Sequence, residues 1–520
     1  MTPRLRRPFT ALLWVPLMLT ACGAGADPQR LASPAWPATQ PFPPAWPTTQ
    51  PAPPALPRTP PFPTWPEPAA AQRALATFHA PSAPHCARPI RTREVPGLAA
   101  QEQARADASG ERSPLERWRK GEGAGAGWAA AATSPAPAIA PHTFAEPSRR
   151  SAKEGHAEPD AIGPEPAWPR QQQQPDAAPV TAGVVDDNAD FAAYLAFRER
   201  TQVPHRPRDV RERYLLQVNN RRGQPLPDAE VSVRSPAGHA MWARSDAGGR
   251  VWLHPDAFDP ARAPSYEVLV RHAGQLGSAR LVRGQKSALE VVVEGAPAQA
   301  RARLDLVFLI DATGSMADEI SKLRSTLRTI ADQVARLPSR PDICFALVAY
   351  RDRGDVFLLR SHDFTNDLGA FQGVLDNVNA GGGGDYPEAL NEALHETVHG
   401  LSWRGDGATR MVLLLADAPP HLDRGGPYYD DDMVAALGKG IKIFSVGASG
   451  LDRQGEYVQR QLAQYTGGRF VFLTYAQAHR PSSGPGRETV HDVSNYSVDT
   501  LDRLVVRLVS DELGRLPRQN

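Results

Sequence analysis

The 520-residue chain is poor in cysteine and nearly balanced in charge. Three cysteines, Cys22, Cys86 and Cys344, are too few to build a disulfide scaffold. Cys344 lies in an apolar run, which favours a buried free thiol over a disulfide with Cys86. A formal net charge of +1 gives no electrostatic basis for binding nucleic acid, so we expect no nucleic-acid partner.

The N-terminus also lacks an apolar stretch long enough to span a membrane comfortably. The run Phe9–Leu19 follows a basic region at residues 4–7 and is too short for a good membrane-spanning helix. Residues 19–22, Leu-Thr-Ala-Cys, resemble the bacterial lipobox, whose cysteine is diacylated. The resemblance implies a signal peptide at 1–21 and a lipid anchor on Cys22 in the bacterial cell envelope. Because no aspartate follows the cysteine, it implies the outer membrane. An ordinary secretory signal is the alternative.

Proline, by contrast, is abundant: 52 residues, concentrated in the first third of the chain. The segment 34–43 recurs almost unchanged as 44–53. Proline at this density favours polyproline II and removes the backbone donors that a sheet needs. We therefore predict a disordered, proline-rich tether over residues 22–185. The alternative is that this segment is a proline-rich ligand that a partner domain binds.

Short alternating strands separated by turn residues follow, and they predict a small all-β sandwich, with a short helix before it, over residues 186–299. The predicted strands are 214–218, 230–234, 251–253, 267–270 and 289–293. The order Gly-x-Pro-x-x-x-Ala-x-Val-x-Val from Gly223, then Asp-Ala-Gly-Gly-x-Val from Asp246, resembles carboxypeptidase-regulatory-like and related immunoglobulin-like domains. This implies a scaffold or adhesion role.

From about residue 300 strands and helices alternate, which is typical of an α/β fold with a doubly wound, mostly parallel sheet. The predicted strands are 304–310, 343–350, 356–361, 411–416, 441–446 and 470–473. The predicted helices are 317–337, 368–378, 388–401, 433–438 and 457–465. We place this domain at 300–476, and a linker with a C-terminal helix at 477–520.

Oxygen-bearing side chains stand where the first of these strands ends. Asp311, Thr313 and Ser315 lie between the strand and the next helix, at the edge where open α/β sheets bind ligands. Their oxygens suit a hard divalent cation. The pattern resembles the metal-ion-dependent adhesion site of von Willebrand factor type A domains, Asp-x-Ser/Thr-x-Ser. Asp417, at the end of the strand 411–416, resembles the last ligand of that site.

The middle loop departs from the common family pattern. The glycine run 381–384 is followed by Asp385-Tyr-Pro-Glu388, where most members carry a threonine. This order resembles the corresponding loop in the A-type domains of integrin β-subunits, in which the glutamate ligates the metal. The resemblance implies Glu388 as the ligand and Asp385 as a neighbouring residue. The alternative is that Asp385 itself fills the threonine position. The expected ion is Mg²⁺, with Mn²⁺ or Ca²⁺ as alternatives.

The resemblance implies binding and not catalysis: the metal holds a protein (or glycan) partner, and an acidic residue of a protein ligand completes the coordination. Two rivals remain open. In one, the metal only stabilises a structural or assembly scaffold. In the other, His395, Glu396 and His399 form a zinc hydrolase, because they fit the H-E-x-x-H pattern.

Two further motifs have structural explanations. We expect the Arg-Gly-Asp sequence at 353–355 to form a turn between two strands, with glycine supplying the unusual backbone angles. We expect the three aspartates at 430–432 to begin a helix, where negative charge meets the helix dipole.

Overall fold

The computed structural model describes residue 86 and residues 92–109, 179–294, 301–384, 386–405, 407–494 and 496–517. The predicted signal peptide, Cys22, the proline-rich repeats and Asp385 lie outside these residues. Every described residue belongs to one compact unit, Trp65–Asn520. Among the helices of this part of the chain, none combines the length and the apolar character needed to cross a membrane.

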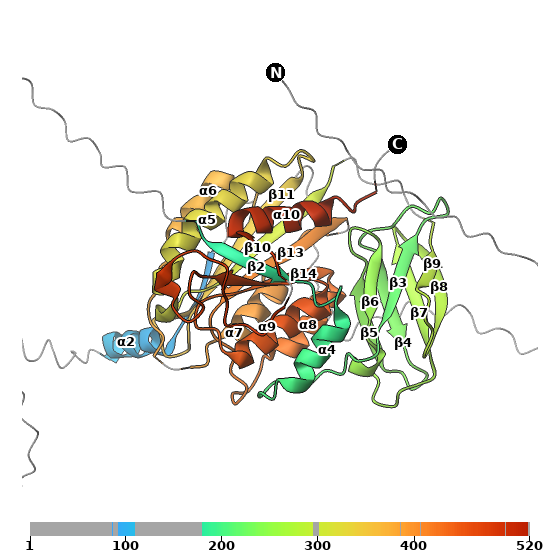
Figure 1. Cartoon of the computed structure of the whole chain (residues 1–520), viewed down its shortest axis with the longest axis horizontal. Helices are drawn as coiled ribbons and strands as arrows, with labels where there is room; N and C mark the ends of the chain where they lie inside the picture. Colours follow the sequence, from blue (N-terminus) through green and yellow to red (C-terminus); the bar gives the residue numbers. More distant parts are fainter. Residues whose placement is uncertain are drawn as a thin grey trace, which may run out of the picture. The chain divides into compact units, whose positions relative to one another are not determined.

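A mixed nine-stranded sheet forms the larger domain, called here the sheet domain (Figure 1). Its strand order is β1-β12-β11-β10-β13-β14-β15-β2-β16. The middle strands pair in parallel, from β11 through β10, β13 and β14 to β15, whereas β1, β12, β2 and β16 are antiparallel additions. The strands are β1 Thr92–Pro96, β2 Thr181–Val185, β10 Arg303–Asp311, β11 Asp342–Tyr350, β12 Phe357–Thr365, β13 Ala408–Ala416, β14 Ile441–Gly447, β15 Phe470–Thr474 and β16 Val498–Thr500.

Alternation along β10 explains how helices cover both faces of this sheet. Phe308 and Ile310 point into one apolar core, and Val307 and Leu309 point into another. The first core is closed by α5 Ala317–Ala335, α6 Leu368–Asp376 and α10 Leu501–Leu513. The second core is closed by α7 Leu390–His395, α8 Tyr429–Gly438 and α9 Arg453–Thr466. The central strands are therefore buried on both faces, which explains their continuous apolar sequences.

The helix predicted at 388–401 is interrupted in the structure. α7 ends at His395, and the π-helix η3, Glu396–Gly400, continues it. Leu401 closes the wider turn, since its N–H donates to the carbonyl of Glu396. The predicted C-terminal helix is confirmed as α10, and it packs against the sheet domain beside α5.

The tether prediction over 22–185 is wrong in two places. Residues 92–96 form β1, followed by α2 Leu98–Ser109, and residues 181–185 form β2. β1 pairs with the edge strand β12, and β2 inserts between β15 and β16. An edge strand leaves a row of backbone donors and acceptors unpaired, and a short segment without internal proline can satisfy them.

The prediction of a free thiol at Cys344 is also wrong. Cys86 and Cys344 form a disulfide with a Cα–Cα distance of 6.2 Å, across 258 residues of sequence. Both residues are buried in the core that α7, α8 and α9 cover. The apolar surroundings of Cys344 are real, but they accommodate a sulfur–sulfur bond as readily as a thiol.

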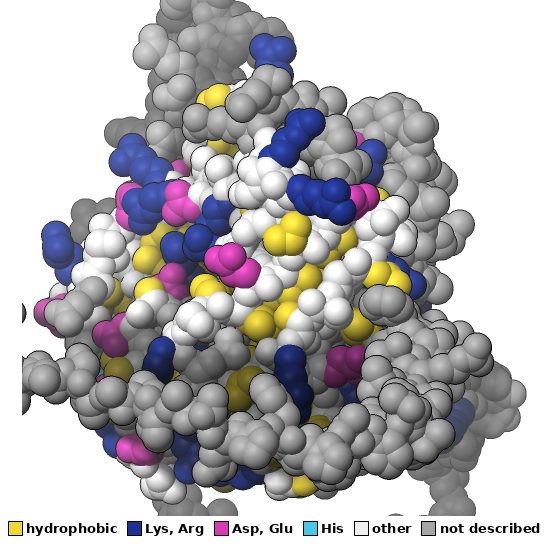
Figure 2. All heavy atoms as spheres, turned by 90° about the vertical axis from the view of Figure 1, so that its right-hand side faces the viewer, with side chains coloured by type: hydrophobic (Ala, Val, Ile, Leu, Met, Phe, Trp, Pro, Cys, Tyr) yellow, Lys and Arg dark blue, Asp and Glu magenta, His cyan; other side chains and the backbone are white. Residues whose placement is uncertain are grey.

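Two small sheets make the second domain, and α4 Phe191–Arg200 precedes them. One has the strand order β6-β3-β9 and the other β5-β4-β7-β8. The strands are β3 Tyr214–Asn219, β4 Glu230–Arg234, β5 Ala240–Arg244, β6 Arg250–Leu253, β7 Ser265–His272, β8 Gln275–Val282 and β9 Leu289–Val292. Figure 2 views this side of the molecule, where apolar side chains lie among charged ones. The large apolar residues exposed on β8 and β9 are Leu276, Val282 and Val292.

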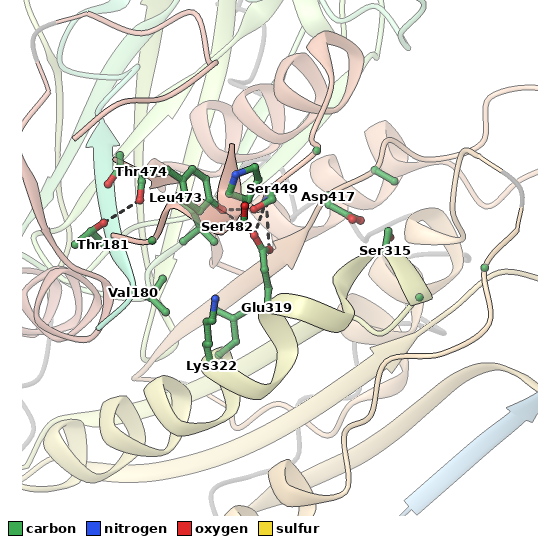
Figure 3. Close-up of a pocket in the computed structure, with 18 of the residues that line it drawn as sticks. Val180, Thr181, Ser315, Glu319, Lys322, Asp417, Ser449, Leu473, Thr474 and Ser482 are labelled. Carbon is green, nitrogen blue, oxygen red and sulfur yellow. Dashed lines mark hydrogen bonds between the residues drawn. The ribbon is translucent and has the colours of Figure 1, made fainter. Parts of the chain in front are cut away.

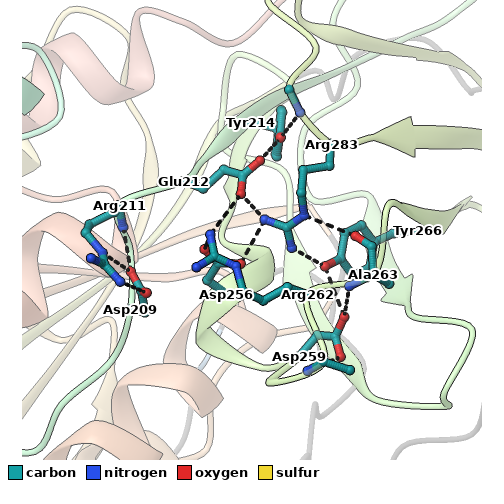
Figure 4. A network of polar contacts seen from close by, with 12 residues as sticks. Asp209, Arg211, Glu212, Tyr214, Asp256, Asp259, Arg262, Ala263, Tyr266 and Arg283 are labelled. Carbon is teal, nitrogen blue, oxygen red and sulfur yellow. Dashed lines mark hydrogen bonds and ion pairs between the residues drawn. The ribbon is translucent and has the colours of Figure 1, made fainter.

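Charged networks brace this small domain. At one end, the guanidinium of Arg283 contacts Glu212, Asp256 and the hydroxyl of Tyr266 (Figure 4). Toward the sheet domain, Arg410 of β13 donates to Asp228 at 2.7 Å, and both side chains are buried. Because a buried charge is costly without its partner, this pair fixes how the two domains meet.

Candidate metal centre

The first loop of the predicted site follows β10 directly. Asp311 ends the strand, and its Oδ1 accepts hydrogen bonds from the Thr313 amide at 3.0 Å and the Thr313 hydroxyl at 2.7 Å. The Thr313 hydroxyl lies 3.0 Å from that of Ser315. Asp311 and Thr313 are fully buried. The three predicted oxygens therefore form one connected group at the start of the following helix.

The glycine run brings the second loop against the first. Gly383 has φ +71°, and a Cβ on it would lie 3.4 Å from the Thr313 side chain and 3.5 Å from Oε1 of Glu388. The Thr313 side chain and the Glu388 carboxylate therefore both lie next to Gly383, on the side where a Cβ would project. The amide of Glu388 donates to the carbonyl of Pro419 at 3.1 Å, which joins this loop to the third. Asp385 lies outside the described residues.

The third loop follows β13, the parallel neighbour of β10. Asp417 comes directly after the strand, and its side chain is buried. The Ser315 hydroxyl lies near Asp417 and lowers the pKa of that carboxyl against the effect of burial. In Figure 3 these two side chains face each other across the edge of the sheet. The structure thus brings together Asp311, Thr313, Ser315, Glu388 and Asp417.

The electrostatics of this edge call for a cation. Burial raises the pKa of Asp311 to about 7, and repulsion from Asp417 adds to the effect. Burial also raises the pKa of Asp417. The hydroxyl of Tyr350 is buried beside the group, and its pKa is raised by burial and then by Asp311, Asp417 and Glu388. Three carboxylates therefore converge at this edge, where burial disfavours the charged forms of Asp311 and Asp417.

Two carboxylate oxygens of the centre are suited to coordinate a cation. Within the described residues, Asp311 Oδ2 and Asp417 Oδ1 are buried and accept no hydrogen bond. A buried anionic oxygen without a partner is costly unless a cation coordinates it. The donor set of carboxylates and hydroxyls suits Mg²⁺ or Ca²⁺ better than a softer metal.

Asp355 supports this centre, and the sequence analysis missed its role. Its carboxylate accepts from the amide of Gly383 at 2.9 Å and from the amide of Asp352 at 3.0 Å. It therefore ties the β11–β12 turn to the glycine loop. Arg353, in the same Arg-Gly-Asp turn, pairs with Glu392 of α7. Both charged residues of the motif thus have partners inside the protein.

A large cavity opens beside the centre. Its volume is about 1140 Å³, and its wall includes Ser315, Glu388 and Asp417 (Figure 3). Farther along the wall, Glu319 accepts from the amide of Ser449 at 3.2 Å and the hydroxyl of Tyr475 at 2.7 Å. The rest of the wall is largely apolar; its members include Pro179, Val180, Leu323, Leu473, Pro481 and Pro485. The site has room for a segment of another molecule.

The H-E-x-x-H residues do not share one centre. His395 and His399 both contact Asp432, at 3.0 Å and 2.9 Å. Glu396 turns away from them, because its carboxylate accepts from the hydroxyl of Ser361 at 2.7 Å and pairs with Arg93. Of the aspartates at 430–432, Asp430 binds Arg206 and Arg208, and Asp431 binds Arg208. All three lie in the first turn of α8, as predicted.

Comparison with known proteins shows a similarity that covers part of the chain. The model of the von Willebrand factor A domain matches residues 305–418. A stretch of 120 residues is 32% identical to the alpha-protein kinase vwkA of Dictyostelium discoideum, over 23% of this chain and 19% of that protein. A stretch of 144 residues is 33% identical to von Willebrand factor A domain-containing protein 7 of Rattus norvegicus, over 27% of this chain and 14% of that protein.

Among solved structures, the PilB minor pilin from Streptococcus sanguinis aligns with a TM-score of 0.26 and 12% identity, over 56% of this chain and 93% of that one. The curated relatives are much longer than the segments they share with this chain, so what the whole relatives do is not carried over. The stretch that the family model matches contains Asp311 and Asp417. Residues 305–418 are a von Willebrand factor A domain.

Proposed function

We propose that the sheet domain binds a divalent cation, Mg²⁺ first and Mn²⁺ or Ca²⁺ as alternatives, and uses it to hold an acidic side chain of a protein partner. Asp311, Thr313, Ser315, Glu388 and Asp417 would hold the ion directly or through water. The observation that carries the proposal is the convergence of three buried carboxylates from three loops, two of them with an oxygen that accepts no hydrogen bond in the described structure.

The cavity supports a partner and not only an ion. Ser315, Glu388 and Asp417 line the cavity (Figure 3). A carboxylate of a second protein that entered the cavity would complete the coordination of the metal. Tyr386 stands at the mouth and is 54% exposed. An exposed aromatic ring beside a charged centre is typical of the residues that dominate binding energy in interfaces. We regard the domain as a binding module and not as an enzyme.

The remaining parts fit a surface-anchored binder in our proposal. Lipidation of Cys22 would fix the chain to the bacterial cell envelope, with the outer membrane as the expected location, and the proline-rich stretch would serve as a spacer. We interpret the sheet with its two helical layers as doubly wound, and the two small sheets as an immunoglobulin-like scaffold. Growth with a labelled fatty acid tests the anchor: label should enter the wild-type chain and be absent from Cys22→Ser.

Titration calorimetry of the full chain with Mg²⁺ is the first test of the metal centre. Wild type and Asp376→Ala, which removes a half-exposed acid of α6, should bind the ion alike. Asp311→Ala should lose the binding. Equal binding by all three proteins would overturn the metal centre.

Crosslinking to envelope proteins, with Mg²⁺ or with a chelator, then tests the partner. The proposal expects a crosslinked species that disappears with the chelator and with Asp311→Ala, and that is retained by Asp376→Ala. Binding of Mg²⁺ that raises the melting temperature without any metal-dependent crosslink would instead identify the domain as a metal-stabilised scaffold.

A further inference from the structure

A second group of metal-ligating side chains lies at the far end of the helix that begins beside Glu388. His395 ends α7, His399 lies in η3, and Asp432 lies in the first turn of α8. One ligand atom of each residue lies within 4.8 Å of the other two. The group shares no residue with the three loops that hold Asp311, Glu388 and Asp417.

Only one of the two carboxylate oxygens of Asp432 takes part in the hydrogen bonds of this group. Oδ1 of Asp432 contacts Nδ1 of His395 at 3.0 Å and Nε2 of His399 at 2.9 Å. Oδ2 is buried and accepts no hydrogen bond from the described residues. The Asp432 side chain is 4% exposed. Two contacts are within the normal capacity of Oδ1, whereas a buried oxygen such as Oδ2 needs a partner, which a cation or a water can supply.

The four-residue spacing of the two histidines places their rings side by side on one face of the helix. The centroids of the His395 and His399 rings are 4.6 Å apart. The wider π turn occupies the position where a regular helix would continue, and such turns are often found at functional sites. Glu396, which would act as base in a zinc protease, is held on another face by Ser361 and Arg93. The arrangement therefore fits binding of a metal and gives no base for hydrolysis.

The second nitrogen of His399 has a partner of its own. Nδ1 lies 3.4 Å from Nζ of Lys439, which also donates to the carbonyl of Val398 at 2.7 Å. A ligating histidine donates its other ring N–H to an acceptor, whereas an ammonium group can only donate. With a metal on Nε2, Nδ1 would carry the ring proton, and Lys439 would keep its bond to the carbonyl of Val398.

We infer that His395, His399 and Asp432 form a site for Zn²⁺ or a similar borderline divalent metal, separate from the oxygen-only centre. Two imidazole nitrogens and one carboxylate oxygen are three of the four ligands that zinc takes, and they are a poor set for Mg²⁺. The His395 side chain is 42% exposed, so the fourth position and the entry path face solvent. A metal here would join α7 and η3 to α8.

Cobalt serves as the spectroscopic probe of this site, because it replaces zinc and its visible absorption reports nitrogen ligation and tetrahedral geometry. The full chain, purified without a histidine tag and treated with chelator, is titrated with Co²⁺ and then with Zn²⁺. Wild type and Asp311→Ala should each bind one equivalent with visible bands that Zn²⁺ removes. His399→Gln should bind about tenfold more weakly or worse. His395→Gln, altered at a half-exposed side chain, provides a second variant if His399→Gln does not fold.

Far-UV circular dichroism of each variant establishes that it is folded. Visible cobalt bands that are lost in Asp311→Ala and kept in both histidine variants would overturn the inference, as would the absence of bands in the wild type. Zinc should also raise the melting temperature of Asp311→Ala while leaving that of His395→Gln unchanged. Because Asp311→Ala is expected to keep this site, failure of the magnesium proposal and failure of this inference give different results.

Discussion

Asp311 and Asp417 end neighbouring parallel strands, β10 and β13, and burial with their mutual repulsion raises the pKa of Asp311 to about 7. The metal-free protein therefore carries an unfavourable charge arrangement at the edge of its own sheet. A divalent cation would convert that repulsion into coordination.

The substitution Asp311→Asn should stabilise the metal-free protein and remove its response to metal. Asparagine keeps the shape of the side chain and an acceptor for Thr313 but removes the charge that Asp417 repels. At pH 8 without metal, we expect the unfolding free energy to rise by on the order of 2 kcal/mol. Mg²⁺ should then give no further shift. Denaturant unfolding with and without metal measures both; an Asp311→Asn protein that is less stable in chelator would contradict the argument.

The contribution of Asp311 to the stability of the metal-free protein should decrease as the pH rises from about 4 to about 7. The folded-state pKa of Asp311 is raised to about 7 from the ordinary 3.8, so in this range the folded state holds a proton that the unfolded state has released. The contribution of this group is full at acidic pH and is lost as the pH passes the folded-state pKa. Melting temperatures measured in chelator over this pH range give the dependence of stability on pH. This dependence should be weaker in Asp311→Asn than in the wild type. Stabilisation by Mg²⁺ should accordingly be larger at pH 8 than at pH 5.

The substitution Glu388→Gln should weaken Mg²⁺ binding more than Asp385→Asn does. The Glu388 carboxylate lies against the first loop, where a Cβ on Gly383 would be 3.5 Å from Oε1, and it contributes to the raised pKa of Tyr350. Both substitutions remove one charge and keep the size of the side chain, so each is a matched control for the other. Calorimetry compares the two dissociation constants. A larger loss in Asp385→Asn would move the ligand role to Asp385.

Loss of the Cys86–Cys344 disulfide should destabilise the folded unit by about 2–4 kcal/mol, because the bond closes a loop of 258 residues in the unfolded chain. Cys86→Ala removes the bond and keeps the buried Cys344. Thermal unfolding with and without a reductant measures the effect: reduction should lower the melting temperature of the wild type and leave that of Cys86→Ala unchanged. A wild-type protein whose thiols are shown to be reduced, but which melts at the same temperature, would contradict this.

The parts of the fold that the sequence predicted are those with strong local signals. β10 ends in Asp311 and β13 is followed directly by Asp417, so each apolar run predicted a strand and a candidate site residue together. The sequence predicted that the first and last loops of the centre lie together, because neighbouring parallel strands have their carboxyl ends at the same edge of the sheet. Glu388 was found only through the resemblance to a known loop.

The parts that were missed depend on partners distant in sequence. β1 and β2 are five residues long and acquire their conformation from the edge strands they join, so their own composition carries little signal. The disulfide joins two of these distant parts, and local polarity predicted a thiol instead. Asp355 looked like a turn residue, and only the folded chain shows that its carboxylate holds Gly383. β8 was missed for another reason: it forms a hairpin with β7, directly before it, but its residues are mostly exposed.

The disulfide also determines where mechanical load would enter the protein. A pull on the chain from the N-terminal side of Cys86 would reach Cys344 of β11 through a covalent bond, without first peeling β1 from the sheet. β11 pairs along its whole length with β10, the strand that ends in Asp311. Tension on the chain before Cys86 would therefore reach β11, the strand beside the one that ends at the candidate metal centre.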